Sequence, residues 1–278
     1  MTEVVQVGKY RFAITRNIQR YEGNIINHTY KIGGVYADCV NISYKYKNNT
    51  AIQAKIPHLL YEPECAVGTF LEKGSGTELM IKTAIRYAYN DVKGITKFEF
   101  DDDSHIDCSP KNMTQRPPRR PKKPLNLAFF YIAYHGQTWY ESRFNARMVN
   151  EERYRGYRQS LAFLTDPAQK PGFSEFLQII GSSLESLEDI ECLKSYYNKS
   201  STYREFFENI PKVKRCQILS VWLGTFMKHY IGRVFDDKGW VINVNTMDGQ
   251  AMDGGATGGA LSRSLKYRIF SYRSASNF

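Results

Sequence analysis

The sequence predicts an α/β (α+β) protein, in which a mixed and mostly antiparallel sheet is followed by a mainly helical region. The first sixty residues alternate polar and apolar side chains and are rich in β-branched and aromatic residues, as strands are. A glycine turn at 74–76 then opens into a segment with helical periodicity. After residue 150 most apolar residues again recur at helical spacing.

Four segments in the first sixty residues are expected to be strands. Turn residues separate them, for example Gly33-Gly34 and Asn48-Asn49. Because the connections are short, neighbouring strands are expected to be antiparallel. The four segments are 10–16, 24–34, 38–47 and 51–61.

A helix of about four turns is expected from Thr77 onward, where apolar residues recur at a spacing near 3.6. Lys93-Gly94 ends it, and residues 95–100 (ITKFEF) have the composition of a further strand. A strand, a turn, a helix and a strand in this order form a βαβ unit. The two flanking strands are therefore expected to be parallel.

The composition changes sharply in residues 109–124 (SPKNMTQRPPRRPKKP), which contain five prolines and six Lys or Arg residues. Such a segment is an exposed basic loop, because proline excludes helix and central strand. We expect a domain boundary near residue 150, which separates a first domain (1–150) from a second one (151–278). The second domain is expected to be helical in 173–197, 202–209 and 214–235, with a glycine-rich, basic tail.

Charge and cysteine content limit the function classes. The net charge of +10 favours acidic partners such as nucleic acid or an anionic cofactor. The five cysteines are scattered and form no CxxC pair. We therefore expect neither a disulfide framework nor a zinc ribbon, and an intracellular, cytoplasmic location. Residues 218–235 are apolar but contain basic residues, so they predict a buried helix and no membrane span.

The glycine turn is the first candidate functional feature. Glycine lets the main chain approach a neighbour closely, and a helix N-terminus has free N–H groups and a partial positive charge. The two together suit a phosphate. An ordinary turn before a helix capped by Ser75 or Thr77 is the alternative interpretation.

The order of these elements resembles the GNAT acyltransferase fold, which has an antiparallel meander, a Gly-x-Gly turn into a helix, a strand, and a later Tyr-Glu-x-x-Phe segment. "EKGSGTELM" looks like the pyrophosphate loop of that family, and "TWYESRF" looks like its Tyr-containing segment. The pair "FDDDSHIDC" and "HGQTWYESRF" also looks like a group of proteins encoded by large nucleocytoplasmic DNA viruses. The resemblance covers about residues 10–148.

The resemblance implies an N-acyltransferase that binds acetyl-CoA, requires no metal and acylates an unknown amine. Tyr140 would be the acid that protonates the departing thiolate, and Glu62 or Glu64 would be the base. A packed tyrosine and two solvated carboxylates are the alternative interpretations of these residues. Leu71 stands where the family has Arg or Gln, so the resemblance favours the fold more than the activity. The implied pyrophosphate-binding residues are Lys73, Gly74, Ser75, Gly76 and Thr77.

The alternative function is a catalytically inactive protein of the same fold that binds nucleic acid or virion components, in the host cytoplasm or in a virion. Clustered Lys and Arg attract phosphates, although a solvated, non-binding loop has the same composition. The candidate contacts are Arg116, Arg119, Arg120, Lys122 and Lys123.

Two further signals allow more than one interpretation. The acidic run Asp101-Asp102-Asp103, with His105, Asp107 and Cys108, has the residue types of a divalent metal site. A solvated strand end with Asp or Ser capping is the alternative interpretation. His135-Gly136 interrupts an aromatic segment and is interpreted as a packing or hinge position.

Overall fold

A computed structural model describes residues 2–92, 94–106, 108, 124–181, 187–236, 238–247 and 268–270. Its internal contacts divide the chain into two compact units. This division falls at positions other than the boundary expected near residue 150. The first unit comprises Met1–Asp101, Arg143–Ala146 and Val241–Phe278, and the second comprises Asp102–Ser142 and Arg147–Trp240.

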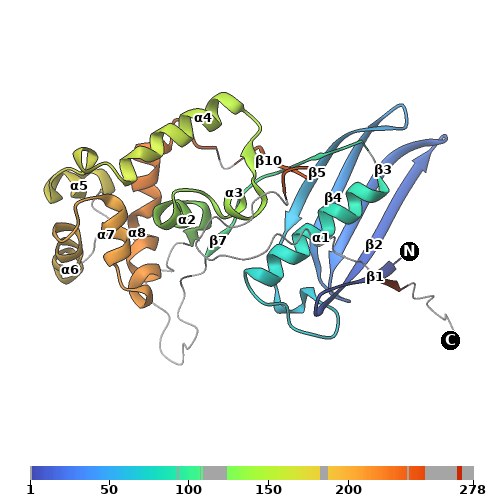
Figure 1. The fold of residues 1–278 in the computed structure, drawn as a ribbon, viewed down its shortest axis with the longest axis horizontal. Coiled ribbons are helices and arrows are strands. Elements are labelled where there is room, and N and C mark those ends of the chain that lie inside the picture. Colours follow the sequence, from blue (N-terminus) through green and yellow to red (C-terminus); the bar gives the residue numbers. More distant parts are fainter. Residues whose placement is uncertain are drawn as a thin grey trace, which may run out of the picture. The chain divides into compact units, whose positions relative to one another are not determined.

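The first unit is built on a mixed, mostly antiparallel sheet, as the sequence predicts (Figure 1). Consecutive strands β1 to β5 pair in antiparallel fashion. The strand β1 was not among the expected segments. These strands are β1 (Thr2–Val7), β2 (Tyr10–Tyr21), β3 (Asn24–Gly33), β4 (Asp38–Lys47) and β5 (Thr50–Leu59).

The hairpin turns follow from residues that tolerate a positive φ. Asn48 and Asn49, between β4 and β5, have φ values of 50° and 60°. Glu22 and Gly23, between β2 and β3, have φ values of 48° and 80°. Two consecutive residues of positive φ match the twist of the flanking strands, and this is why Asn and Gly are favoured there.

A βαβ unit completes the first unit and confirms the expected parallel pair. Helix α1 (Ser75–Asp91) connects β5 to β6 (Lys97–Phe100). Ala54 lies opposite Phe98, and Ile56 lies opposite Phe100, in parallel register. The strand order in this unit is β11-β1-β2-β3-β4-β5-β6-β10, in which β10 (Trp240–Asn243) and β11 (Arg268–Phe270) were not predicted.

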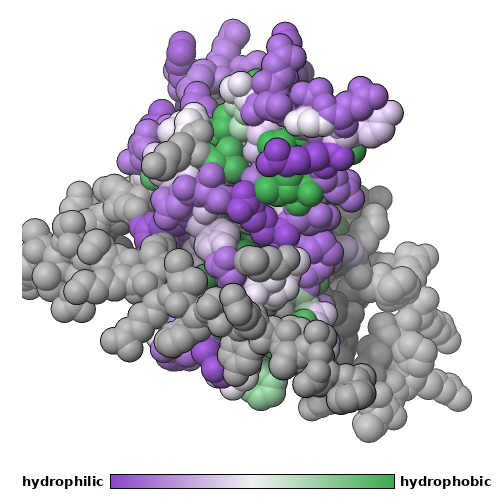
Figure 2. Space-filling view, turned by 90° about the vertical axis from the view of Figure 1, so that its right-hand side faces the viewer, coloured by the Kyte–Doolittle hydropathy of each residue, from purple (hydrophilic) through white to green (hydrophobic). Residues whose placement is uncertain are grey.

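One face of α1 contacts β3 and β4 and forms the core of the first unit. The apolar stripe expected on this helix is buried, because its residues recur on the side that faces the sheet. On the right-hand side of the view in Figure 1, hydrophilic side chains cover most of the described surface, with small hydrophobic areas between them (Figure 2). The buried residues of the stripe are Met80, Ile81, Ala84, Ile85 and Ala88.

Two disulfides correct the expectation that the cysteines stay unpaired. Cys39 and Cys65 are bonded in the first unit, and Cys108 and Cys216 are bonded in the second. The two cysteines of each bond are 26 and 108 residues apart in the chain, respectively. No local motif such as CxxC announces pairs of this kind, because folding alone brings the partners together.

The second unit is mainly helical, as expected, and its described residues also form three short strands. The single helix predicted for 173–197 is wrong: Gly181 follows α5 with a φ of 71° and ends it. The helices are α2 (Leu127–His135), α3 (Trp139–Phe144), α4 (Glu151–Ser160), α5 (Phe173–Ile180), α6 (Leu187–Asn198), α7 (Tyr203–Asn209) and α8 (Lys212–Ile231). The short strands are β7 (His105–Ile106), β8 (Leu125–Asn126) and β9 (Arg147–Met148).

Aromatic rings form the core between α5, α6, α7 and α8. The Phe176 ring centroid lies 4.6 Å from that of Tyr197 and 5.5 Å from that of Trp222. The Phe176–Trp222 pair is edge-to-face, and pairs of this kind add stability beyond the area that they bury. Such packing accounts for part of the Tyr and Phe content of the chain, which is 20 and 16 residues. Among the described residues, no helix combines the length and the apolar character that a membrane crossing needs.

Candidate functional site

The glycine turn forms the N-terminus of α1 and lies beyond the carboxyl end of β5. Gly74 is the residue before the helix and has a φ of 86°, which a residue with a side chain rarely adopts. Its carbonyl oxygen accepts a hydrogen bond from the N–H of Glu78 at 2.9 Å. Within the described residues, the N–H groups of Ser75, Gly76 and Thr77 have no protein acceptor. A helix end of this kind has the donors and the partial charge that bind an anion.

The second glycine of the turn is explained by packing. A Cβ atom on Gly76 would lie 3.0 Å from Leu71 Cδ1 and 3.3 Å from Tyr10 Oη. Leu71 is 2% exposed, so it is a core residue of the turn. Its side chain thus fills the space beside Gly76 with hydrocarbon, at the position where the resemblance implies an Arg or Gln.

Polar side chains surround the rest of the turn. The hydroxyl group of Thr77 is buried and has no hydrogen-bond partner in the described part of the chain. The Nζ atom of Lys73 lies 5.9 Å from the Tyr61 ring centroid and is exposed. Next to the turn, the hydrogen bond from Lys9 and the charge of its ammonium group lower the pKa of Glu72. The charge of the Glu72 carboxylate is therefore neutralised by a cation.

The two carboxylates expected as bases belong to the same unit as the turn. Glu62 precedes a short 3₁₀ helix (Pro63–Cys65), and Glu64 lies within it. Both are exposed to solvent. The backbone N–H of Glu62 donates to Cys65 Sγ at 3.2 Å, so the disulfide-bonded cysteine fixes the start of this segment.

Tyr140, the expected acid, lies on α3 in the second unit and is 5% exposed. Burial raises its pKa well above the usual value, and the negative charge of Asp102 raises the pKa further. The phenol therefore stays protonated at neutral pH. An acid must be protonated, but a pKa so far above neutrality also makes the phenol a weaker proton donor than an ordinary tyrosine.

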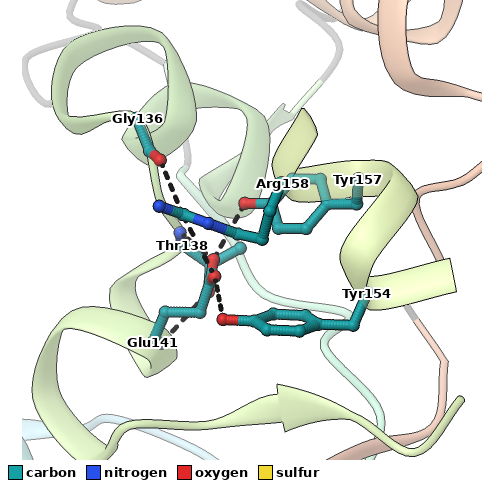
Figure 3. Close-up of polar contacts among 6 residues, drawn as sticks. All are labelled: Gly136, Thr138, Glu141, Tyr154, Tyr157 and Arg158. Carbon is teal, nitrogen blue, oxygen red and sulfur yellow. Dashed lines mark hydrogen bonds and ion pairs between the residues drawn. The ribbon is translucent and has the colours of Figure 1, made fainter. Parts of the chain in front are cut away.

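The neighbouring Glu141 carries the densest polar network of α3 and α4 (Figure 3). Its carboxylate is 4% exposed. One oxygen, Oε2, accepts from the Thr138 N–H at 2.7 Å and from Tyr157 Oη at 2.8 Å. The other oxygen, Oε1, accepts from Tyr154 Oη at 3.1 Å and lies 3.4 Å from the Arg158 guanidinium. A buried carboxylate with partners for both oxygens fixes the two helices in one arrangement.

The Glu141 network was missed by the sequence analysis, although its local signal is present. Thr138-x-x-Glu141 is a capping box: the Glu141 N–H donates to Thr138 Oγ1 at 3.1 Å, and the carboxylate accepts from the Thr138 N–H. The motif interpreted as a family signature thus has a structural explanation of its own. Burial, and then the charge of Glu141, raise the pKa of Tyr154 to about 12.

The acidic run is explained by capping and pairing. Asp102 is buried, and its Oδ1 accepts from the Ser104 N–H at 3.2 Å. Asp103 forms an ion pair with Lys238 at 2.9 Å. The described residues contain no group of three or more His, Cys, Asp or Glu side chains able to hold a metal ion.

The basic residues expected to contact nucleic acid or a partner protein lie outside the described residues, as does most of the glycine-rich tail. His135 packs against Tyr131, with ring centroids 4.3 Å apart, and Gly136 ends α2 with a φ of 67°. The residues outside the described ranges are Arg116, Arg119, Arg120, Lys122 and Lys123.

Comparisons with protein-family models, with curated proteins and with solved structures find no match to this chain.

Proposed function

We propose that the protein is a GNAT-like N-acyltransferase whose first unit binds the pyrophosphate of acetyl-CoA at the N-terminus of α1. One observation carries the proposal: the N–H groups of Ser75, Gly76 and Thr77 have no protein acceptor in the described residues, at the start of a 17-residue helix. This helix connects the two parallel strands β5 and β6. A phosphate at such a helix end receives several N–H donors and the favourable end of the helix dipole.

The chemistry that follows is acyl transfer to an amine. The amine nitrogen attacks the thioester carbonyl carbon, loses a proton to a base, and the C–S bond breaks as the sulfur takes a proton from an acid. Glu62 and Glu64 are the proposed bases, through water, because both carboxylates are exposed in the segment between β5 and α1. The resemblance implies Tyr140 as the acid, but this residue belongs to the other unit. Burial raises its pKa, which makes its phenol a weaker acid.

Acetyl-CoA binding is tested by a thermal-shift titration of the intact protein. A ligand that binds only the native state raises the melting temperature as its concentration passes the Kd. The decisive variant is Ser75→Asp. Ser75 is exposed at the first position of α1, where an added carboxylate favours the helix but repels a pyrophosphate. The variant is therefore expected to fold normally and to bind acetyl-CoA at least about tenfold more weakly.

The matched control is Val213→Asp, which adds the same charge at the second position of α8, where Val213 is 92% exposed. It is expected to leave acetyl-CoA binding unchanged. The proposal fails if acetyl-CoA does not shift the melting temperature of the wild-type protein, or if the two variants bind acetyl-CoA equally well.

Binding without catalysis is the second candidate function, and the burial of Leu71 favours it. A buried leucine supplies no cation to the phosphates at the position where the related motif has Arg or Gln. Release of the free CoA thiol in the presence of amine acceptors distinguishes the two functions. Acetyl-CoA binding without thiol release over a range of amines favours the inactive protein, for which salt-dependent DNA binding is the next measurement.

A further inference from the structure

A polar pocket opens in the first unit, at the C-terminal end of α1. Its volume is about 400 Å³. The walls come from the β2–β3 hairpin, the β4–β5 hairpin and the end of the helix, which lie side by side (Figure 1). Asn49 holds the two hairpins together, because its Oδ1 accepts from the Ile25 N–H at 2.8 Å. With about 1.5 Å per residue, the length of α1 separates this pocket from the glycine turn by about 25 Å.

A buried histidine lies in the wall of this pocket. His28 is 2% exposed, and its Nδ1 lies 2.7 Å from Tyr46 Oη. Its Nε2 accepts from the Arg16 Nε–H at 3.4 Å. Because Nε2 uses its lone pair for this hydrogen bond, the proton of the neutral ring is on Nδ1 and is donated to Tyr46.

The charges around His28 favour the neutral ring. Burial lowers the pKa of His28, and the positive charge of Arg16 lowers it further, whereas Asp91 has the opposite and smaller effect. Asp91 Oδ2 is 3.7 Å from Nε2. The same carboxylate pairs with Arg16 at 3.0 Å and accepts a hydrogen bond from Tyr30, so it is already satisfied by the protein.

This arrangement leaves hydrogen-bond donors that are available to a ligand in the pocket. Since Tyr46 Oη accepts from His28, its own O–H is available to donate into the pocket. Arg20 also lines the pocket, is exposed, and has no carboxylate partner among the described residues. Two guanidinium groups and one carboxylate give the described lining a net positive charge.

We propose that this pocket binds a small anionic molecule through a carboxylate or phosphate group, held by Arg20, Arg16 and the Tyr46 hydroxyl. A guanidinium presents paired N–H donors that match two oxygens of either group. The phenol adds a third, neutral donor. The site is independent of the acetyl-CoA proposal, because it uses none of the residues of the glycine turn.

Histidine NMR of the intact protein tests this proposal. The chain contains five histidines, and the signal of His28 is assigned as the one that Tyr46→Phe shifts, because that change removes the partner of Nδ1. Inorganic phosphate and acetate are titrated separately at constant ionic strength. A saturable shift of the His28 signal is expected with at least one of them, and the anion with the lower Kd identifies the class of the natural ligand.

Two exposed cations provide matched variants. Arg20→Gln is expected to raise the Kd about tenfold, since it removes a charged donor from the pocket. Lys45 is next to Tyr46 in β4, and its side chain points to the opposite face of the strand, away from the pocket. Lys45→Gln therefore removes the same charge outside the pocket and is expected to leave the Kd unchanged. The proposal is overturned if neither anion gives a saturable shift, or if both variants weaken binding alike. Tyr46→Phe provides an independent check and is expected to weaken binding as well.

Discussion

The Glu141 network makes a quantitative prediction about the stability of the second unit. Glu141→Ala leaves two buried donors, the Thr138 N–H and the Tyr157 hydroxyl, without an acceptor. Each such group costs about 1–3 kcal/mol. Arg158 contributes little, because its side chain is 44% exposed. The half-buried Tyr154 also loses its acceptor, at a smaller cost. Together these losses are expected to lower the free energy of unfolding by about 3–5 kcal/mol.

The conservative variant Glu141→Gln is expected to cost less, about 1–2 kcal/mol. An amide keeps one oxygen, and that oxygen is expected to take the position of Oε2, because the Thr138 N–H can only donate. The amide nitrogen then faces Tyr154, whose hydroxyl group can rotate and accept a hydrogen bond from it. A larger loss of stability in Glu141→Ala than in Glu141→Gln therefore tests the hydrogen-bond directions as well as the presence of the network.

Urea unfolding followed by tryptophan fluorescence measures this effect in the right unit, because all three tryptophans lie in the second unit. The control is Glu191→Ala, which removes a carboxylate that is 70% exposed on α6 and is expected to change the stability by less than about 0.5 kcal/mol. A loss below about 1 kcal/mol in Glu141→Ala, or equal losses in the alanine and glutamine variants, would refute this reasoning.

Three further predictions concern stability. Reduction of the two disulfides is expected to cost about 2–4 kcal/mol each, and an unchanged melting temperature with a reductant would contradict this. The pKa of His28 is lowered from 6.5 in the folded protein, so its contribution to stability is full above about pH 6.5 and is lost as the pH falls toward the folded pKa. In calorimetry between pH 7 and 5, His28→Gln is therefore expected to lose less stability than the wild type, and equal losses would speak against the buried neutral ring. Gly34→Ala places a Cβ 1.9 Å from the Glu64 carbonyl oxygen and is expected to cost about 3 kcal/mol in urea unfolding, whereas Gly172→Ala, which meets nothing within 4 Å, is expected to change little.

Local patterns predicted the first unit well, because its strands and helix follow directly from residue periodicity. The alternation in β4 buries Val40, Ile42 and Tyr44 on one face, and the Asn48-Asn49 turn fixes the hairpin to β5. The strand β10 was missed, since it is four residues long and far in sequence from the other strands. A short segment of this kind has too few residues to show a period.

The sites depend on contacts that sequence patterns do not contain. His28, Tyr46 and Asp91 come from β3, β4 and α1, and each has an ordinary local context. The sheet register and the length of α1 together bring these three side chains close to one another. The capping box of Glu141 could have been predicted from Thr138-x-x-Glu141, but its burial by two tyrosines of α4 required the packing of the second unit.

The bond between Cys108 and Cys216 has a practical consequence for limited proteolysis. A protease that cuts the chain once anywhere between these two residues produces fragments that stay covalently attached. On a gel without reductant such a nicked molecule migrates as one species, and the pieces separate when thiol is added. Fragment maps of this protein therefore need one gel lane with reductant and one without it. The lane without reductant alone hides every cut between Cys108 and Cys216.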